Sequence, residues 1–426
     1  MKGFITGLGL LAVISCQAQK ADGIINDKEV ERIETVLAAD DMQGRKTGTP
    51  GIEKAADFIS AEFKAAGLQY FGKEKSYRQE FTMVSPKLIS TTGTWDGVEM
   101  DSKKIISVTS QPSLKVDEKS GYEWGEVPAA KNIFAEAQSF IQSGKNYIVL
   151  IDESYEKNFA RLAFFKRQMF KKNNSVIFVL SSKKPATFSI DITHEITEQK
   201  LANVVGVLPG KSKKDEYVVF SAHYDHLGIK KGATGDSIYN GANDDAAGTT
   251  AVILLAKYFK ALGNNERTII FTAFTAEEIG GYGSQYFSEQ LEPAKVMAMF
   301  NIEMIGTESK WGKNSAYITG YEKTDMGTIL QKNLEGSGFT FYPDPYPEQQ
   351  LFYRSDNATL ARLGVPAHTI STSKMDSEPN YHKLSDEVKT LDIANMTQII
   401  HSIAISSKTI VAGTDSPSRV KPEQLR

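Results

Sequence analysis

Several side chains suited to metal chemistry stand where predicted strands and helices begin or end. His223 and Asp225 come directly after the apolar, β-branched run 217–220, which is typical of a buried strand in a parallel sheet. Asp244 stands just before the N-terminus of a predicted helix, 246–262. In an open α/β sheet, ligands bind beyond the carboxyl ends of the strands, and helix N-termini favour anions. We therefore expect these three side chains to share one crevice and to form the outline of a metal site.

Further candidate ligands recur where other predicted strands end. Glu277 and Glu278 follow the predicted strand 268–272, while Glu303 and His382 stand in the later segments NIEMIG and NYHKLSD. One such acid alone is weak evidence, but the geometry of a sheet brings all of these positions to one edge. Two imidazoles with three or four carboxylates suit zinc at neutral pH, and the share of carboxylates suits two ions bridged by one acid. Two such ions together acidify a bridging water, and without a cation the clustered acids would repel one another.

The elements that must position these side chains alternate regularly from Asn203 onward. Strands that alternate with helices predict an α/β fold with a doubly wound, mixed, mostly parallel sheet. The predicted strands span residues 204–208, 217–220, 268–272, 297–304 and 367–371. The predicted helices span residues 246–262, 326–334 and 358–363, with a further helix through Phe287 and an amphipathic one that carries Ile393, Met396, Ile400 and Ile403.

The rest of the chain divides into further segments. Residues 26–84 contain two predicted helices, the second with Thr49 as its N-cap and Pro50 in its first turn, and form the first part of the catalytic domain. Residues 85–200 carry short alternating runs, a strand at 147–151, an aromatic-rich helix near 159–170 and a strand at 175–180. They predict an inserted, smaller, β-rich α+β domain that is structural or shapes substrate access. Residues 201–412 form the main catalytic domain, and the polar tail 413–426 is expected to be disordered.

Composition and the N-terminus limit the partners of the chain. Its 426 residues are 41% hydrophobic and 24% charged, and the net charge of -3 gives no reason to propose nucleic acid as a partner. After Met1 and Lys2, the uncharged residues 3–15 form a signal-peptide core that is too short to span a bilayer. Residues 13–16 resemble a bacterial lipobox, in which Cys16 would be lipidated. Cleavage after Ala18, giving a signal peptide 1–18 of the ordinary type, is the alternative.

Cys16 is the only cysteine of the chain, so no disulfide is expected in the mature protein. Both interpretations of the N-terminus predict export. The protein would be periplasmic, held at the outer membrane or cell surface as a lipoprotein, or secreted. Membrane contact is expected only through a lipid anchor at Cys16. The sequence does not indicate an oligomeric state.

Six segments, in this order and spacing, resemble a known family: HYDHLG, NGANDDAAG, FTAEEIGGYGS, NIEMIG, FYRSDN and YHKLSDEV. They are similar to the zinc aminopeptidase family that also contains glutamate carboxypeptidase and, as divergent relatives, the transferrin receptor and glutaminyl cyclase. QGRKTGTPG near the N-terminus resembles bacterial members, and the insert resembles a protease-associated domain through residues 144–150. The resemblance covers about residues 40–86 and 203–406 and implies the zinc exopeptidase fold.

The resemblance implies a ligand set for two zinc ions. Asp244 would bridge the two ions. Glu278 and His382 would complete one ion, and His223 and Glu303 would complete the other.

It also implies two further catalytic roles. Glu277 would be the general base. It would take a proton from the water that bridges the metals, leaving a hydroxide, and pass that proton to the leaving amine. Asp225 would orient His223 and fix its tautomer. Adjacent side chains in a turn point in different directions, so neighbouring glutamates can divide into one base and one ligand.

The sequence departs from the family pattern at two positions. Glu303 stands where Asp is usual, which changes the reach of that ligand, and Asn357 replaces a usual His, which puts a substrate contact there in doubt. Asp356 and Asp386 are expected to support the ligand loops. Tyr353 could donate to an oxyanion, although packing is the favoured interpretation. His194 is interpreted as a surface residue rather than a ligand. The other remaining histidines, His226, His368 and His401, are interpreted as structural or surface residues.

These observations predict an exported two-zinc exopeptidase that removes N-terminal residues from peptides. A carboxypeptidase or dipeptidase of the same family is the first alternative, because Arg354 could bind a substrate carboxylate. A glutaminyl cyclase-like acyltransferase is a second alternative, although those relatives use one zinc. A surface binding module with a dead site is the third, and the complete ligand set argues against it.

Overall fold

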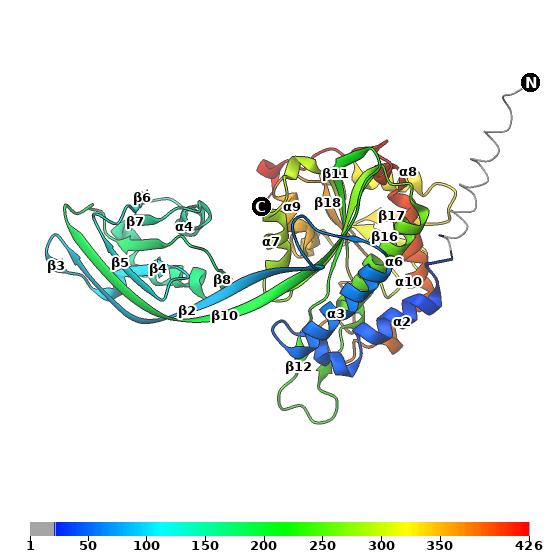
Figure 1. Ribbon diagram of the computed structural model, residues 1–426, viewed down its shortest axis with the longest axis horizontal. Coiled ribbons are helices and arrows are strands. Elements are labelled where there is room, and N and C mark those ends of the chain that lie inside the picture. Colours follow the sequence, from blue (N-terminus) through cyan, green and yellow to red (C-terminus); the bar gives the residue numbers. More distant parts are fainter. Residues whose placement is uncertain (1–20, 22, 426) are drawn as a thin grey trace, which may run out of the picture. The chain divides into compact units, whose positions relative to one another are not determined.

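The computed structural model describes residues 21 and 23–425 (Figure 1). These residues form two compact units: the first combines the described residues up to Glu80 with those from Leu201 onward, and the second is Phe81–Lys200. Two long strands, β2 (Arg78–Trp95) and β10 (Phe188–Leu208), contribute residues to both units. The expected signal peptide and the lipobox cysteine lie outside the described residues. Within the described residues, every helix is too short or too polar to span a bilayer.

The first unit is built on a mixed, mostly parallel sheet. Its strands lie in the order β17-β16-β18-β15-β11-β14-β10. The neighbours β18-β15, β15-β11, β11-β14 and β16-β17 are parallel, whereas β16-β18 and β14-β10 are antiparallel. The strand bounds are β11 (Lys213–His223), β14 (Arg267–Phe274), β15 (Val296–Ile302), β16 (Ser315–Ile318), β17 (Thr340–Pro343) and β18 (Ala367–Ser371). Short strands add β1 (Gln69–Tyr70), β12 (Gly228–Ile229) and β13 (Ile238–Tyr239).

Helices cover both faces of this sheet (Figure 1). On β11, Val218 and Phe220 pack into the core beneath α3, α6 and α10, whereas Val219 packs into a second core with α7 and α9. A strand that is buried on both faces must be apolar throughout, which explains the unbroken run of β-branched and aromatic residues. The helix bounds are α2 (Asp27–Leu37), α3 (Pro50–Ala65), α6 (Ala247–Leu262), α7 (Tyr282–Glu289), α8 (Met326–Asn333), α9 (Asn357–Ala361), α10 (Ile393–Ser406) and α11 (Lys408–Val411). The predicted doubly wound α/β fold is confirmed.

One glycine lets helix α6 approach the sheet. A Cβ atom on Gly248 would lie 2.2 Å from the carbonyl oxygen of Ile302 and 2.4 Å from Oδ2 of Asp245. Both distances are too short for any side chain, so only glycine allows the first turn of α6 to contact the end of β15. This close contact brings the residues just before α6 next to those just after β15.

The second unit is a smaller α/β arrangement. Its four-stranded sheet has the order β4-β9-β7-β6, with β6-β7 and β7-β9 parallel and β4-β9 antiparallel. Val149 and Phe178 pack on one face and Ile148 and Ile177 on the other, so this sheet is also buried on both sides. The elements are β3 (Val98–Glu99), β4 (Ile105–Val108), β5 (Ser113–Asp117), β6 (Glu123–Val127), α4 (Ile133–Gln142), β7 (Tyr147–Ile151), α5 (Glu156–Phe159), β8 (Met169–Phe170) and β9 (Val176–Leu180).

Two local expectations differ from the structure, and a third is confirmed with a different hydrogen bond. The aromatic-rich segment near 159–170 is not one helix, because α5 is followed by a 3₁₀ segment, Ala160–Lys166, and by strand β8. Thr49 is the N-cap of α3, but its hydroxyl donates to the carbonyl of Lys46 at 2.7 Å rather than accepting from the helix.

The polar tail is ordered rather than disordered. Arg267, which is buried, donates from Nη1 to the carbonyl of Asp415 at 2.6 Å, and Arg419 donates to the carbonyl of Val296 at 2.6 Å. Val420 is buried. The composition of the tail hid these contacts because a few hydrogen bonds from arginine side chains to main-chain carbonyls, and a few apolar side chains, hold it.

Candidate metal centre and active-site cavity

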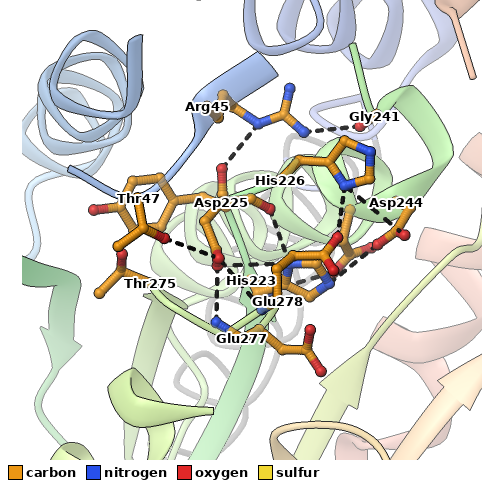
Figure 2. Close-up of polar contacts among 12 residues, drawn as sticks. Arg45, Thr47, His223, Asp225, His226, Gly241, Asp244, Thr275, Glu277 and Glu278 are labelled. Atoms are coloured by element: carbon orange, nitrogen blue, oxygen red, sulfur yellow. Dashed lines mark hydrogen bonds and ion pairs between the residues drawn. The ribbon is translucent and has the colours of Figure 1, made fainter. Parts of the chain in front are cut away.

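Asp244 lies between two imidazoles at the carboxyl end of the sheet. Its Oδ1 is 3.3 Å from Nε2 of His223, which is the last residue of β11. Its Oδ2 is 3.2 Å from Nε2 of His382, which lies on a loop before α10. Figure 2 shows the side chains of His223 and Asp244 directed toward each other. Each carboxylate oxygen of Asp244 therefore faces a different histidine.

The remaining candidate ligands complete two groups around Asp244. Glu303 directly follows β15, and one of its oxygens lies within 4.8 Å of ligand atoms of His223 and Asp244. We name these three residues the His223 group. Glu278 places Oε2 at 3.2 Å from Nε2 of His382, and we name Asp244, Glu278 and His382 the Glu278 group.

The donor atoms of the His223 group fit a bound cation. Nε2 of His223 and Oε2 of Glu303 are buried and have no hydrogen-bond partner among the described residues. Buried polar atoms rarely lack a partner unless they serve a ligand. Zinc binds such atoms at about 2.0–2.2 Å in tetrahedral geometry, which places neighbouring ligand atoms roughly 3.3 Å apart. The separations of 3.2 and 3.3 Å between facing ligand atoms match that spacing in both groups.

The charges within the site shift the pKa values in opposite directions. Burial acts to lower the pKa of His223, but pairing with Asp244 and nearby carboxylates holds it well above its usual value. Hydrogen bonding to Asp244 and Glu278 raises the pKa of His382 to about 10. Burial opposes the change in Asp244, yet its two imidazole partners lower its pKa. The cluster thus favours positive charge at its centre, as a cation site requires.

Three buried carboxylates hold the ligand segments by accepting main-chain N–H groups. Asp225 accepts from the nitrogens of Glu277 at 3.0 Å and Glu278 at 3.3 Å. Asp245 accepts from Gly248 and Met304, each at 3.0 Å, and Asp386 accepts from Asn243 at 2.8 Å and Asp244 at 3.0 Å. The expected supporting role of Asp386 is therefore confirmed. The ligand loops are fixed to one another and not only to the sheet.

The structure differs from expectation in the atom of Asp225 that faces His223. Nδ1 of His223 lies 3.1 Å from the main-chain carbonyl oxygen of Asp225, whereas Oδ1 is 3.8 Å away. Since a carbonyl oxygen can only accept, His223 carries its proton on Nδ1 and leaves Nε2 free to face Asp244. The carboxylate of Asp225 instead fixes the turn that bears Glu277 and Glu278.

Left-handed backbone conformations mark three of the ligand turns. Ala276 before Glu277, Met304 after Glu303, and His382 itself have φ values of 61°, 51° and 55°. A non-glycine residue in this region is strained by roughly 1–3 kcal/mol and persists only where the surrounding structure enforces it. Such residues cluster at functional sites, which agrees with the position of these turns.

Glu277 lines a cavity together with the metal-site residues. Asp244, Glu303 and His382 form one part of its wall. Burial raises the pKa of Glu277 well above its usual value. A carboxyl group with a raised pKa beside such a site is suited to take up and release a proton. The other lining residues are Met304, Tyr317, Thr319, Leu351, Arg354, Ser355, Thr369, Ser371, Met375 and Tyr381.

Two residues near this cavity act as packing residues. Asn357 is fully buried and donates from Nδ2 to the carbonyl of Phe352 at 3.0 Å, so it does not reach the cavity. Tyr353 packs against the core beneath α7 and α9 and does not line the cavity, in agreement with the favoured interpretation.

The ring of Tyr381 lines the cavity and stacks on His382, with ring centroids 4.0 Å apart. Sequence reasoning missed Tyr381, although it directly precedes a candidate ligand.

The histidines outside the ligand set have different environments. His368 and His401 have hydrogen-bond contacts within the fold, to Thr319 and Ile25. The expectation that His194 lies at the surface is wrong, because it is 3% exposed and its Nε2 lies 3.1 Å from Oγ of Ser107. His226, also interpreted as structural, lies within the site beside Glu278. Its signal in the sequence was its place on the same strand exit as His223.

The sequence of the main unit matches a known peptidase family. The defining pattern of Peptidase family M28 matches residues 203–405, which include all the candidate ligands. A probable leucine aminopeptidase of Trichophyton verrucosum is 28% identical over 206 residues, which cover 46% of this chain and 54% of the relative. Aminopeptidase YwaD of Bacillus subtilis is 30% identical over 140 residues, 32% of this chain and 28% of the relative. The chain thus spans about half the length, or less, of these curated relatives.

Solved structures share the fold at low sequence identity. An aminopeptidase from Aneurinibacillus sp. strain AM-1 superposes with a TM-score of 0.54 at 15% identity, covering 96% of this chain and 98% of that one. A zinc aminopeptidase from Bacillus subtilis gives a TM-score of 0.54 at 16% identity, covering 93% and 98%. The expected zinc exopeptidase fold is confirmed. Together with the sequence match, this fold shows that residues 203–405 form a peptidase family M28 domain.

Proposed function

We propose that this protein is an exported aminopeptidase that uses two zinc ions to release N-terminal residues from peptides. The observation that carries the proposal is the position of Asp244, whose two oxygens face His223 and His382 at 3.3 and 3.2 Å. A carboxylate placed in this way can serve two cations at once. The M28 match and the aminopeptidases among the relatives support the same activity.

The residues present divide the catalytic tasks. The His223 group and the Glu278 group would each hold one zinc ion, with Asp244 common to both. Bound zinc lowers the pKa of water and polarises a carbonyl group. Glu277, in the same cavity, accepts the proton of the attacking water and delivers it to the leaving amine. Asp225 keeps the main chain of Glu277 in place throughout, through the 3.0 Å hydrogen bond.

Apolar side chains in the cavity wall support a preference for apolar first residues. Met304, Leu351 and Met375 supply apolar surface, and the buried Tyr317 closes the wall with its hydroxyl donated to the carbonyl of Ser373 at 3.0 Å. Buried apolar surface contributes roughly 25 cal/mol per Å² to the binding of an apolar side chain. Export rests on the N-terminal sequence, with its short apolar core and Cys16.

We expect the purified protein to bind two zinc ions per chain and to lose activity when they are removed. Elemental analysis after dialysis measures the stoichiometry, and a chelator followed by added zinc tests removal and restoration. A result near one zinc per chain, with ammonia released from peptides that begin with Gln, would instead favour the cyclase-like alternative. A metal-free and inert protein would favour a binding module.

Blocked substrates distinguish the aminopeptidase from its first rival. We expect a free aminoacyl amide to be hydrolysed and its N-acetylated form to be resistant, because the site would bind the free amino end. Arg354 lines the same cavity, and among the described residues its Nη1 makes only a long hydrogen bond of 3.5 Å to Oε1 of Gln349, so a substrate carboxylate could reach the guanidinium. Cleavage of N-acetylated peptides with a free carboxyl end would count against the aminopeptidase and support a carboxypeptidase.

A further inference from the structure

A third imidazole lies beside the Glu278 group. His226 follows β11 by three residues, and its side chain is fully buried. In Figure 2 its ring points toward Glu278 and Asp244. Nδ1 is 2.7 Å from Oε1 of Glu278 and 3.8 Å from Oδ2 of Asp244. The inference below rests on the proposed metal-binding function of this group.

The distances separate a hydrogen-bond donor from a metal ligand. Two atoms bound to one tetrahedral zinc ion lie roughly 3.3 Å apart, which fits the 3.2 Å between Nε2 of His382 and Oε2 of Glu278. A charge-assisted N–H to carboxylate hydrogen bond is about 2.7–2.9 Å long, which fits the 2.7 Å from Nδ1 of His226 to Oε1 of Glu278. The two histidines therefore contact different oxygens of Glu278 in different ways.

The two oxygens of Glu278 consequently have different tasks. Oε2 faces Nε2 of His382, whose other neighbour is Oδ2 of Asp244. Oε1 accepts a hydrogen bond from Nδ1–H of His226. With one oxygen held by this hydrogen bond, Glu278 offers a single oxygen to a cation.

The surrounding chain fixes the imidazole of His226 in this orientation. A Cβ on Gly241 would lie 2.5 Å from Cδ2 and 2.6 Å from Cγ of the ring, so the Gly241 backbone is packed directly against it. The main-chain nitrogen of His226 donates to the carbonyl of Arg45 at 3.2 Å. Nε2 of His226 has no hydrogen-bond partner among residues 21 and 23–425, so the contact with Glu278 is the polar contact that orients the ring.

We propose that His226 is a positioning residue for the metal site. Its Nδ1–H holds Oε1 of Glu278 out of coordination and presents Oε2 to the ion shared with Asp244 and His382. The residue sets chiefly the affinity of the Glu278 group, because its hydrogen bond is to Glu278, which belongs to that group alone, whereas Oδ2 of the shared Asp244 lies 3.8 Å from Nδ1. Loss of a hydrogen bond to a metal-ligating side chain typically lowers metal affinity 10–100-fold.

Two substitutions of this residue test the role. His226→Ala removes the donor. His226→Asn keeps one, because the amide nitrogen of asparagine is bonded to Cγ just as Nδ1 of the imidazole is. His401→Ala is the matched control, because His401 contacts the carbonyl of Ile25 and no candidate ligand. Zinc affinities are measured by competition with a chromophoric chelator, and circular dichroism of the metal-free proteins checks folding.

We expect His226→Ala to bind one zinc ion with wild-type affinity and the other 10–100-fold more weakly. His226→Asn should stay within a few-fold of wild type, and His401→Ala should not differ from it. If His226→Ala binds each of the two ions with the same affinity as wild type, the proposal is overturned. Equal losses in His226→Ala and His226→Asn would overturn it as well, since they would show that the imidazole itself is required.

A structure of the zinc-loaded wild-type protein tests the same point if the variants do not fold. The proposal requires Nδ1 of His226 to remain hydrogen-bonded to an Oε1 that does not contact zinc. An ion within about 2.1 Å of Nδ1 would show a ligand rather than a donor and would overturn it. If the wild-type protein binds no zinc, the proposed function fails. If it binds two ions and His226→Ala does so equally well, only this inference fails.

Discussion

Glu277→Gln is expected to lower kcat by roughly 10²–10⁴-fold while both zinc ions remain bound. Glutamine has the same size and shape but cannot accept the proton of the attacking water. The substitution leaves the main-chain N–H of residue 277 free to donate to Asp225, so the turn that carries Glu278 should keep its position. The measurement is kcat on an aminoacyl amide together with the zinc content of the same sample.

The matched control for this variant is Glu289→Gln. Glu289 is an exposed residue at the end of α7 and lines no part of the cavity. It should have wild-type kcat. A Glu277→Gln variant that keeps its zinc and retains activity within tenfold of wild type would show that another group accepts the proton.

Arg45→Met is expected to lower the free energy of unfolding by roughly 3 kcal/mol or more. The guanidinium of Arg45 is fully buried and donates to four main-chain carbonyls at 2.6–2.8 Å. Figure 2 shows it above the loop that carries Asp225 and His226. Each buried carbonyl left without a partner costs about 1–3 kcal/mol. The four acceptors are the carbonyls of Leu37, Tyr224, Asn240 and Gly241.

Chemical denaturation of the metal-free protein measures this effect without the contribution of bound ions. Arg32→Met is the control, since Arg32 is partly exposed and pairs with Glu29 and Glu62, contacts that are worth at most about 1 kcal/mol at a surface. The loss of free energy of unfolding in Arg45→Lys should fall between the losses in Arg45→Met and Arg32→Met, because a single ammonium cannot reach carbonyls on three segments. Wild-type stability of Arg45→Met would show that other donors satisfy these carbonyls.

The strand exits were predictable because their signals are local. Apolar, β-branched runs such as residues 217–220 and 367–371 can be recognised in any buried parallel strand, and β18 has the expected bounds. Polar residues at the ends of such strands must meet at one edge of the sheet. The position of Asp244 beside His223 needed a second local rule, that the N-terminus of a helix at this edge favours an anion. Assignment of the two ions needed the family resemblance as well.

Other features depend on contacts between distant segments and left no local signal. Arg45 stands in a polar, Gly-rich loop that is typical of a surface turn, yet its side chain is buried beneath residues about 180–200 positions away. His226 was dismissed because a histidine beside a motif is more often structural than functional. Strands β16 and β17 are too short to show a periodic pattern.

The two-sided position of Asp244 limits how such a protein could diverge. In the proposed two-zinc site, a substitution of this residue would disturb both groups of ligands together, so we expect it to abolish catalysis in one step. An ancestor that gives rise to a single-ion descendant would first have to change a residue that belongs to one group only, such as Glu303 or Glu278. Variation at those two positions among descendants of this fold is therefore where a change of metal stoichiometry, and with it a change of reaction, would begin.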